Sequence, residues 1–314
     1  MSPMPTVLVA GAAVQDFIYR FDAAPARGTK GRAKDFASIG GGSGANAAVA
    51  VVRLGGKGQV LAPLGDDLIG EMIIQGLVKE GVDTSKVLRI PGRASPVCSA
   101  IVDGDGERTI LTWHPPHVAP PEIDDADALV ADVDAVLTDD RYPTIAIPLL
   151  EAAKRKGIPG VLDGDRAEGD APQMLQAASH VVFGTPGLRG TSGISDPIKG
   201  LKAMHGVTDA FLAVTLGSGG VLWLDGDVVR RMQSFPVHAV DTLGAGDVFH
   251  GSFALALAEG KSEPEALRFA SAVSAIKCSR FGGRAGVPNR DEVTGFLIGQ
   301  PIDPSMGYGV VPAQ

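Results

Sequence analysis

The sequence predicts an α/β fold whose mostly parallel central sheet is covered by helices on both faces. Short apolar runs such as Ala135–Thr138 alternate with amphipathic stretches such as Ile145–Lys156 along most of the chain. The 314 residues are 45% hydrophobic and 20% charged, which is enough to bury a sizeable core. Two segments rich in β signals, 17–38 and 99–112, interrupt this alternation and predict a small β lid beside the sheet.

The elements follow in chain order from periodicity and from turn residues. The first strand is expected over Val7–Val14, and later strands over Val60–Leu64, Val87–Ile90, Ala135–Thr138, Gly160–Leu162, His180–Phe183, Ala210–Thr215 and Val221–Leu224. Helices are expected from the glycine stretch 40–46 to Leu54, and over Leu68–Glu80, Ile145–Lys156, Val248–Ala258, Glu263–Cys278 and Arg290–Leu297. No linker divides the chain, so a single domain over 1–314 is expected, with residues 301–314 as an extended or loose tail.

The predicted lid combines two separate β segments. Residues 17–38 carry scattered aromatic residues among Pro25, Gly28 and Gly31, while 99–112 has the pattern of a hairpin with a turn at Asp103–Gly106. Such segments expose strand edges that a protein must cover or pair, and closed two-fold dimers are the commonest oligomers. We therefore expect a homodimer that pairs through the lid.

Composition excludes several classes of partner. The net charge of −8 and an aromatic content of 5% argue against nucleic-acid binding. No apolar run approaches the ~18 residues of a membrane span, so no membrane partner is expected. Cys98 and Cys278 are far apart and form no C-x-x-C motif, which favours a cytoplasmic location.

The segment 241–247, Asp-Thr-Leu-Gly-Ala-Gly-Asp, carries the clearest chemistry in the chain. Gly244, Ala245 and Gly246 bring nearly bare amides to the start of a helix, where free donors and the helix dipole favour an anion such as a transferring phosphoryl group. Asp247 follows at once and is placed to accept the proton of an attacking hydroxyl. The alternative is that Asp247 is an ordinary first-turn aspartate and that the glycines only shape a turn.

Two further segments are candidates for holding a substrate. Asp16 is expected just past the end of the first strand, where ligands of open α/β sheets bind, although an exposed surface aspartate is equally compatible. The glycines of 40–46 would let a substrate lie against the backbone, and Asn46 offers both a donor and an acceptor to hydroxyl groups. The same glycines loosely match a dinucleotide fingerprint, but they follow the predicted lid and not a strand of a βαβ unit.

The pairing of Gly41, Gly42 and Asn46 with the segment 241–247 resembles the ribokinase-like sugar kinases, the pfkB family. The resemblance spans nearly the whole chain and implies a three-layer fold and ATP- and Mg²⁺-dependent phosphorylation of a sugar hydroxyl, and it leaves a requirement for K⁺ open. It implies Asp247 as the base, Gly244, Ala245 and Gly246 as the anion hole, and Asp16, Gly41, Gly42 and Asn46 as sugar-binding residues. It also implies a nucleotide site at Thr215, Gly217, Gly219, Asp241, Thr242 and Gly283.

The chain departs from this family at the position of an Asn-x-x-Glu motif that serves magnesium and phosphate in many members. The sequence here is Gly184-Thr185-Pro186-Gly187. Asp163 and Asp165, which correspond to the family's Asp-x-Asn, are candidates to hold the water shell of the metal instead. A glycine-containing turn without a metal is the alternative for these two residues.

Within the family the chain most resembles bacterial kinases of 6-deoxy-6-sulfofructose, notably over 160–165, 185–188, 241–251 and 277–286. That likeness implies Lys30 and Arg141 as cations for a sulfonate, with Thr112 at a position that is typically asparagine. From the residues alone, side chains such as Lys30 and Arg141 are more often solvated surface charges than ligands. The expected activity is phosphorylation of a primary hydroxyl of a ketose-like sugar. The alternatives are a kinase for fructose or 2-keto-3-deoxygluconate, and an inactive sugar or nucleotide sensor.

Overall fold

A nine-stranded sheet forms the centre of the computed structural model, which describes residues 4–104, 108–115, 122–165, 171–299 and 309–310. The strand order is β15-β14-β13-β12-β11-β10-β9-β1-β4. The six neighbouring strands β4, β1, β9, β10, β11 and β12 pair in parallel. Strands β13, β14 and β15 add to β12 by antiparallel pairing. The bounds are β1 Thr6–Ala10, β4 Lys57–Leu61, β9 Ala135–Asp139, β10 Gly160–Gly164, β11 His180–Gly184, β12 Phe211–Thr215, β13 Val221–Asp225, β14 Val228–Met232 and β15 Gly309–Val310. The predicted, mostly parallel sheet is therefore confirmed.

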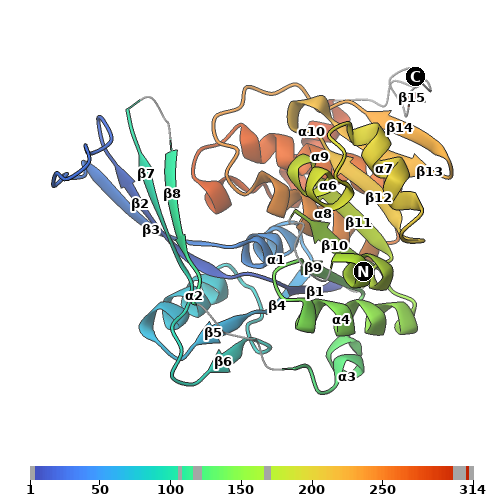
Figure 1. The fold of residues 1–314 in the computed structure, drawn as a ribbon, viewed down its shortest axis with the longest axis horizontal. Coiled ribbons are helices and arrows are strands. Elements are labelled where there is room, and N and C mark those ends of the chain that lie inside the picture. Colours follow the sequence, from blue (N-terminus) through green and yellow to red (C-terminus); the bar gives the residue numbers. More distant parts are fainter. Residues whose placement is uncertain (1–3, 105–107, 116–121, 166–170, 300–308, 311–314) are drawn as a thin grey trace.

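Helices cover both faces of this sheet and give three layers (Figure 1). Alternate residues of β1 show the division, since Val7 and Val9 pack in one core and Leu8 and Ala10 in the other. The first core lies under α1 Ser43–Arg53, α2 Leu68–Lys79, α8 Ala245–Ala258, α9 Glu263–Cys278 and α10 Arg290–Ile298. The opposite face carries α3 Ala126–Val130, α4 Pro143–Lys156, α5 Ala171–Ala177, α6 Thr185–Ser192 and α7 Pro197–His205.

A second sheet of four strands projects from this body and contains both predicted lid segments (Figure 1). Its order is β3-β2-β7-β8, with bounds β2 Val14–Arg20, β3 Asp35–Gly41, β7 Val97–Val102 and β8 Arg108–Trp113. We call these four strands the lid. A short parallel pair, β5 Pro63–Gly65 and β6 Leu88–Ile90, lies near the base of the lid together with α2 (Figure 1).

The first predicted strand, Val7–Val14, is wrong in its extent. The chain leaves the main sheet after Ala10 and enters the lid at Val14, and between the two strands the amide of Ala12 donates to the Asp139 carboxylate at 2.7 Å. Asp16 consequently lies inside β2 and not just past the end of β1. The apolar run of Gly11–Val14 hides this change of sheet.

Other differences concern short elements. The predicted strand Val60–Leu64 is divided between β4 and β5, and Val87–Ile90 corresponds to β6, which pairs with β5 outside the main sheet. Strands β14 and β15, four short helices and two 3₁₀ turns, η1 Gly217–Gly219 and η2 Gly283–Gly286, were not predicted. Most of the predicted tail 301–314, and part of the predicted turn Asp103–Gly106, lie outside the described residues. Within the described ranges, no helix is both long enough and apolar enough to cross a membrane.

Candidate active site

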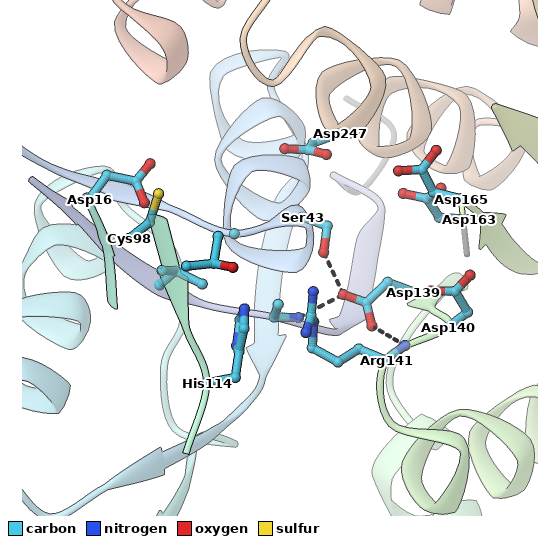
Figure 2. A pocket seen from close by; sticks show the side chains of 14 residues that line it. Asp16, Ser43, Cys98, His114, Asp139, Asp140, Arg141, Asp163, Asp165 and Asp247 are labelled. Carbon is cyan, nitrogen blue, oxygen red and sulfur yellow. Dashed lines mark hydrogen bonds between the residues drawn. The ribbon is translucent and has the colours of Figure 1, made fainter. Parts of the chain in front are cut away.

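A pocket of about 260 Å³ opens where the lid meets the carboxyl ends of the parallel strands. Of the described residues that line it, six are aspartates, from both the lid and the body: Asp16, Asp139, Asp140, Asp163, Asp165 and Asp247. Figure 2 shows Asp16 and Cys98 on one side of the pocket, Asp247 above Ser43, and Asp163 with Asp165 on the far side. A polar cleft with convergent carboxylates at this edge of an α/β sheet is the expected place for catalysis.

Asp247 stands in the first turn of α8, behind the predicted anion site. Gly244 caps this helix with φ of 73°, a left-handed conformation that favours glycine. The amide of Ala245 donates to Thr242 O at 3.2 Å, so it is engaged within the loop. The amides of Gly246 and Asp247 open the helix and have no intrahelical acceptor, and a Cβ added to Gly246 would meet open space. An anion therefore has both donors and room at this end of α8.

Asn46 orients the Asp247 carboxylate. Its Nδ2 donates to Asp247 Oδ2 at 2.7 Å, while its Oδ1 accepts from Arg284 Nε at 3.1 Å. Burial raises the pKa of Asp247 above its ordinary value, and the hydrogen bond from Asn46 opposes this. Both polar atoms of Asn46 thus have protein partners, and Asn46 does not line the pocket. The structure places it as a link between Arg284 and Asp247.

The side chain of Arg284 occupies the space beside the glycines at 40 and 41. A Cβ at Gly40 would lie 2.3 Å from Arg284 Nη1, and Nη2 of the same guanidinium donates to Gly41 O at 3.4 Å. Burial lowers the pKa of Arg284 to about 10, although nearby Glu80 and Asp16 act in the opposite direction. The first of these glycines therefore makes room for a buried arginine.

Asp16 occupies the lid side of the pocket. A Cβ at Gly41 would lie 2.2 Å from its Oδ2, so the neighbouring strand can approach Asp16 only because residue 41 is glycine. Burial raises the pKa of Asp16 to about 6, with Arg284 opposing this shift and Asp247 adding to it. Gly42, with φ of 92°, lines the pocket, and a Cβ there would lie 2.5 Å from Ala12 O. The carboxylate of Asp16 is placed to accept hydrogen bonds from a bound ligand.

Asp139 fixes the floor of the pocket and was not predicted. Its Oδ2 accepts from Ser43 Oγ at 2.5 Å and from the Ala12 amide, and its Oδ1 accepts from the Arg141 amide at 3.1 Å (Figure 2). These bonds join the end of β1, the start of α1 and the turn after β9. Asp139 therefore connects these three segments at the wall of the pocket.

Asp163 and Asp165 lie together on the body side of the pocket (Figure 2). Asp163 is 7% exposed, and its buried Oδ1 has no hydrogen-bond partner. Its Oδ2 lies 3.3 Å from Nδ1 of the buried His250. Burial raises the pKa of Asp163 well above its ordinary value, and Asp247 and Asp165 add to the effect. Among the described residues, no cation appears among the groups that shift this pKa.

Asp165 occupies the space left by the altered motif at 184–187. A Cβ at Gly184 would lie 2.6 Å from Asp165 Oδ1, and a Cβ at Gly187 would lie 1.9 Å from Gly164 O. The loop after β10 is therefore packed where side chains at 184 and 187 would begin. Although six aspartates line the pocket, no three acidic, histidine or cysteine side chains of the described residues are arranged to hold a metal ion, so a metal here would need ligands from a substrate or from water.

The predicted nucleotide residues lie along the end of β12 and the loops beside α8. Thr215 ends β12 and accepts at its carbonyl from Thr185 Oγ1 at 2.9 Å, while Gly217 and Gly219 form η1. Asp241 is buried and accepts from the amide of Gly283 at 2.9 Å. Thr242 is exposed. None of these residues lines the pocket described above.

Two of the three residues predicted to contact a sulfonate line the pocket, and the third does not. Arg141 and Thr112 line the pocket, but Lys30 lies in the exposed loop between β2 and β3 and is not among the described lining residues. His114 and Cys98 also line the pocket and were not predicted. Burial raises the pKa of Cys98 to about 11, so its thiol stays protonated at neutral pH.

Comparison with known proteins gives one consistent answer. The sequence profile of the pfkB family carbohydrate kinases matches residues 4–290. The ribokinase of Bacillus subtilis is 30% identical over 296 residues, covering 94% of this chain and all of the relative. The crystal structure of a ribokinase homologue from Agrobacterium tumefaciens superimposes with a TM-score of 0.90 at 36% identity, over 95% of this chain and 98% of the other. Arabidopsis thaliana ribokinase, solved with ribose and ATP, gives 0.85 at 27% identity, over 94% and 99%.

Proposed function

The chain belongs to the pfkB family of carbohydrate kinases, and from its site we propose that it transfers the γ-phosphoryl group of ATP to a primary hydroxyl of a sugar held between Asp16 and Asp247. It is a phosphotransferase with an alcohol group as acceptor. The observation that carries the proposal is the placement of Asp247 in the pocket, in the same helical turn as the open amide of Gly246. The Arabidopsis relative with ribose and ATP supports the two substrates.

The proposed reaction uses Asp247 as the general base. Its carboxylate takes the proton of the attacking sugar hydroxyl, and a raised pKa makes it a better proton acceptor at neutral pH. Asn46 keeps the carboxylate aimed into the pocket through the 2.7 Å hydrogen bond. The amides of Gly246 and Asp247 then stabilise negative charge on the transferring group. Asp16, ionised above about pH 6, accepts hydrogen bonds from sugar hydroxyls and fixes the orientation of the ring.

Asp163 and Asp165 fit the magnesium ion that ATP-dependent kinases use. The buried Oδ1 of Asp163 without a partner, and the raised pKa of this carboxyl, both indicate a site that a nearby cation would stabilise. Bound Mg²⁺ would supply neutralisation of charge on the nucleotide phosphates. We propose that these two aspartates hold its water shell in place of the Asn-x-x-Glu motif that residues 184–187 lack.

We propose that nucleotide binds along the loops at the end of β12 and beside α8. Thr215, Gly217 and Gly219 offer main-chain groups without bulky side chains, and Thr242 and Gly283 border the same helix start. Asp241 holds this region together through the amides of Leu243 and Gly283, at 2.9 Å each. Thr242 leads directly into the start of α8, where the γ-phosphoryl group of ATP must reach the anion site.

For the sugar, we propose a ketose-like substrate with an anionic far end, such as 6-deoxy-6-sulfofructose. Arg141 supports this choice, because it brings a guanidinium into a pocket that the described residues line otherwise with aspartates, His114 and small or non-ionic residues. Thr112 lines the same pocket and can donate one hydrogen bond. Ribose is a second candidate, favoured by the relatives named ribokinase. A role for Lys30 in binding the anion stays a prediction.

A coupled assay of ADP release tests both levels of the proposal. The panel contains ribose, fructose, 2-keto-3-deoxygluconate and 6-deoxy-6-sulfofructose, with Mg²⁺ and ATP. We expect turnover with at least one sugar and the highest kcat/KM with the sulfonated one. Preference for ribose would support the kinase proposal and contradict the proposal of an anionic substrate. Nucleotide binding without ADP release from any sugar would instead indicate a sensor.

We propose that residues 1–314 form one α/β kinase domain. We also propose that two copies of this domain form a homodimer that pairs through the lid. The edges of the lid sheet are β3 and β8, and large apolar side chains are exposed on it: Phe36, Ile110, Leu111 and Trp113. Both cysteines are free thiols, which supports a cytoplasmic location. Sedimentation velocity should give a dimer, and Trp113→Glu should shift it toward monomer. A monomer at all concentrations would contradict the pairing.

A further inference from the structure

Lys277 places an ammonium group in the protein interior, beside the loop that opens the anion site. The residue lies in the last turn of α9, and it is 0% exposed. Its Nζ donates to the main-chain oxygen of Asp241 at 2.8 Å and lies 4.0 Å from the carboxylate oxygen Oδ1 of the same residue. Burying an ammonium is costly unless polar and charged groups compensate it. The groups around Lys277 therefore indicate which part of the structure its charge stabilises.

Helix α9 forms hydrogen bonds with both ends of the loop that leads from Val240 to Ala245. The amides of Val240 and Asp241 donate to Cys278 O at 2.8 and 3.1 Å. At the other end, Ser274 Oγ donates to Ala245 O at 3.1 Å, in the first turn of α8. Lys277 lies between these contacts along α9. These polar contacts connect α9 to both ends of the loop and add to the apolar packing of α8 against α9.

The carboxylate of Asp241 ties the loop to a third segment. It accepts from the Leu243 amide at 2.9 Å, and from the amides of Gly282 and Gly283 at 3.1 and 2.9 Å. Burial works against ionisation here, but these amides and the Lys277 ammonium together lower the pKa of Asp241 to about 2. An ionised carboxylate and a carbonyl oxygen of one residue therefore converge on one buried positive charge.

We propose that Lys277 is a positioning residue that acts as a built-in monovalent cation for the 241–247 loop, so that turnover requires no added K⁺. Two oxygens of Asp241 that would attract a dissolved cation already face the Lys277 ammonium. A second cation at these oxygens would meet repulsion from that charge in a medium of low dielectric. The inference rests on the proposed kinase function. It identifies the Lys277 ammonium as the cation that orders the anion site of the enzyme.

The first test uses the unaltered protein. ADP release is measured with the preferred sugar, MgATP and tetramethylammonium as the monovalent cation, with and without KCl. We expect rates that agree within about twofold, because a neutralised site gains little from a further ion. Activation by K⁺ of tenfold or more would overturn the inference while leaving the kinase proposal intact. A protein that releases no ADP with any sugar would overturn both.

The second test removes the charge. Lys277→Met should lower kcat about 10- to 100-fold, the loss expected for a hydrogen bond from a charged group, and should change KM for the sugar much less. Because the variant leaves a space beside two oxygens, NH₄⁺ or K⁺ should restore part of kcat with saturation. Lys202→Met, an exposed lysine in the last turn of α7, is the matched control and should behave as the parent.

Two results of the second test would count against the built-in cation. One is a folded Lys277→Met protein that keeps kcat within twofold of the parent. The other is a lowered kcat that neither NH₄⁺ nor K⁺ raises, which would show a packing role only. Thermal melting and ADP binding establish that the variant is folded. If it does not fold, the K⁺ dependence of the parent decides the question alone.

Discussion

Replacing Arg284 by methionine should separate its two effects on the site. The side chain of methionine fills a similar space but donates no hydrogen bond. The variant loses the 3.1 Å bond to Asn46 Oδ1 and the 3.4 Å bond to Gly41 O. A hydrogen bond from a charged donor contributes about 1.5–3 kcal/mol, so misorientation of Asn46 and Asp247 should lower kcat about 10- to 100-fold.

The same variant should also move the pH profile. Arg284 acts to lower the pKa of Asp16, which burial raises to about 6. Without the guanidinium the pKa of Asp16 rises further, and its ionised form is available only at higher pH. We expect the acid limb of kcat/KM near pH 6 in the parent, where Asp16 of the free enzyme titrates, and at higher pH in the variant.

Steady-state rates of ADP release from pH 5 to 9 measure both effects, and thermal melting shows whether the variant is folded. Arg280→Met, which removes a guanidinium paired with Glu292 on the surface, is the matched control. It should leave kcat and the acid limb unchanged. An Arg284→Met enzyme whose acid limb stays in place, or moves to lower pH, would refute the electrostatic link between Arg284 and Asp16.

Three further changes test other parts of the site and of the fold. Arg141→Ala should raise KM for a sulfonated sugar about 10- to 100-fold and leave KM for fructose nearly unchanged; equal effects on both sugars would remove the anionic substrate. Gly184→Ala should displace Asp165, because the new Cβ would lie 2.6 Å from its Oδ1, and should raise the Mg²⁺ concentration for half-maximal rate. An unchanged Mg²⁺ response would separate Asp165 from the metal. Asp67→Ala removes the N-cap of α2 and an acceptor for Ser95, and urea unfolding should show a loss of about 1–2 kcal/mol; a loss below 0.5 kcal/mol would contradict it.

The sequence was sufficient to predict the layers and the start of the helix that carries Asp247. Apolar alternation defined the parallel strands, and the segment 241–247 carried the chemistry in consecutive residues. The first strand was drawn too long because Gly11–Val14 is as apolar as the strand before it. The segment that leaves the sheet bonds to Asp139, which lies more than 120 residues later.

The support around Asp247 could not be predicted for a related reason. Arg284 and Asn46 are separated by 238 positions, and neither residue type alone indicates that they meet. The glycines at 40 and 41 looked like room for a substrate, whereas the structure fills that room with Arg284 and Asp16. Lys277 lay in a helix whose pattern gives no sign of a fully buried ammonium.

The most direct test of the account is the turnover of Asp247→Asn. The amide keeps the shape of the carboxylate but cannot take the hydroxyl proton, and general-base contributions are typically about 10²–10⁴-fold. We predict that kcat for ADP release falls by this factor while ATP binding, measured by calorimetry, stays within about threefold of the parent. A folded Asp247→Asn protein that turns over within tenfold of the parent would contradict the role of Asp247 as the base, and with it the proposed mechanism.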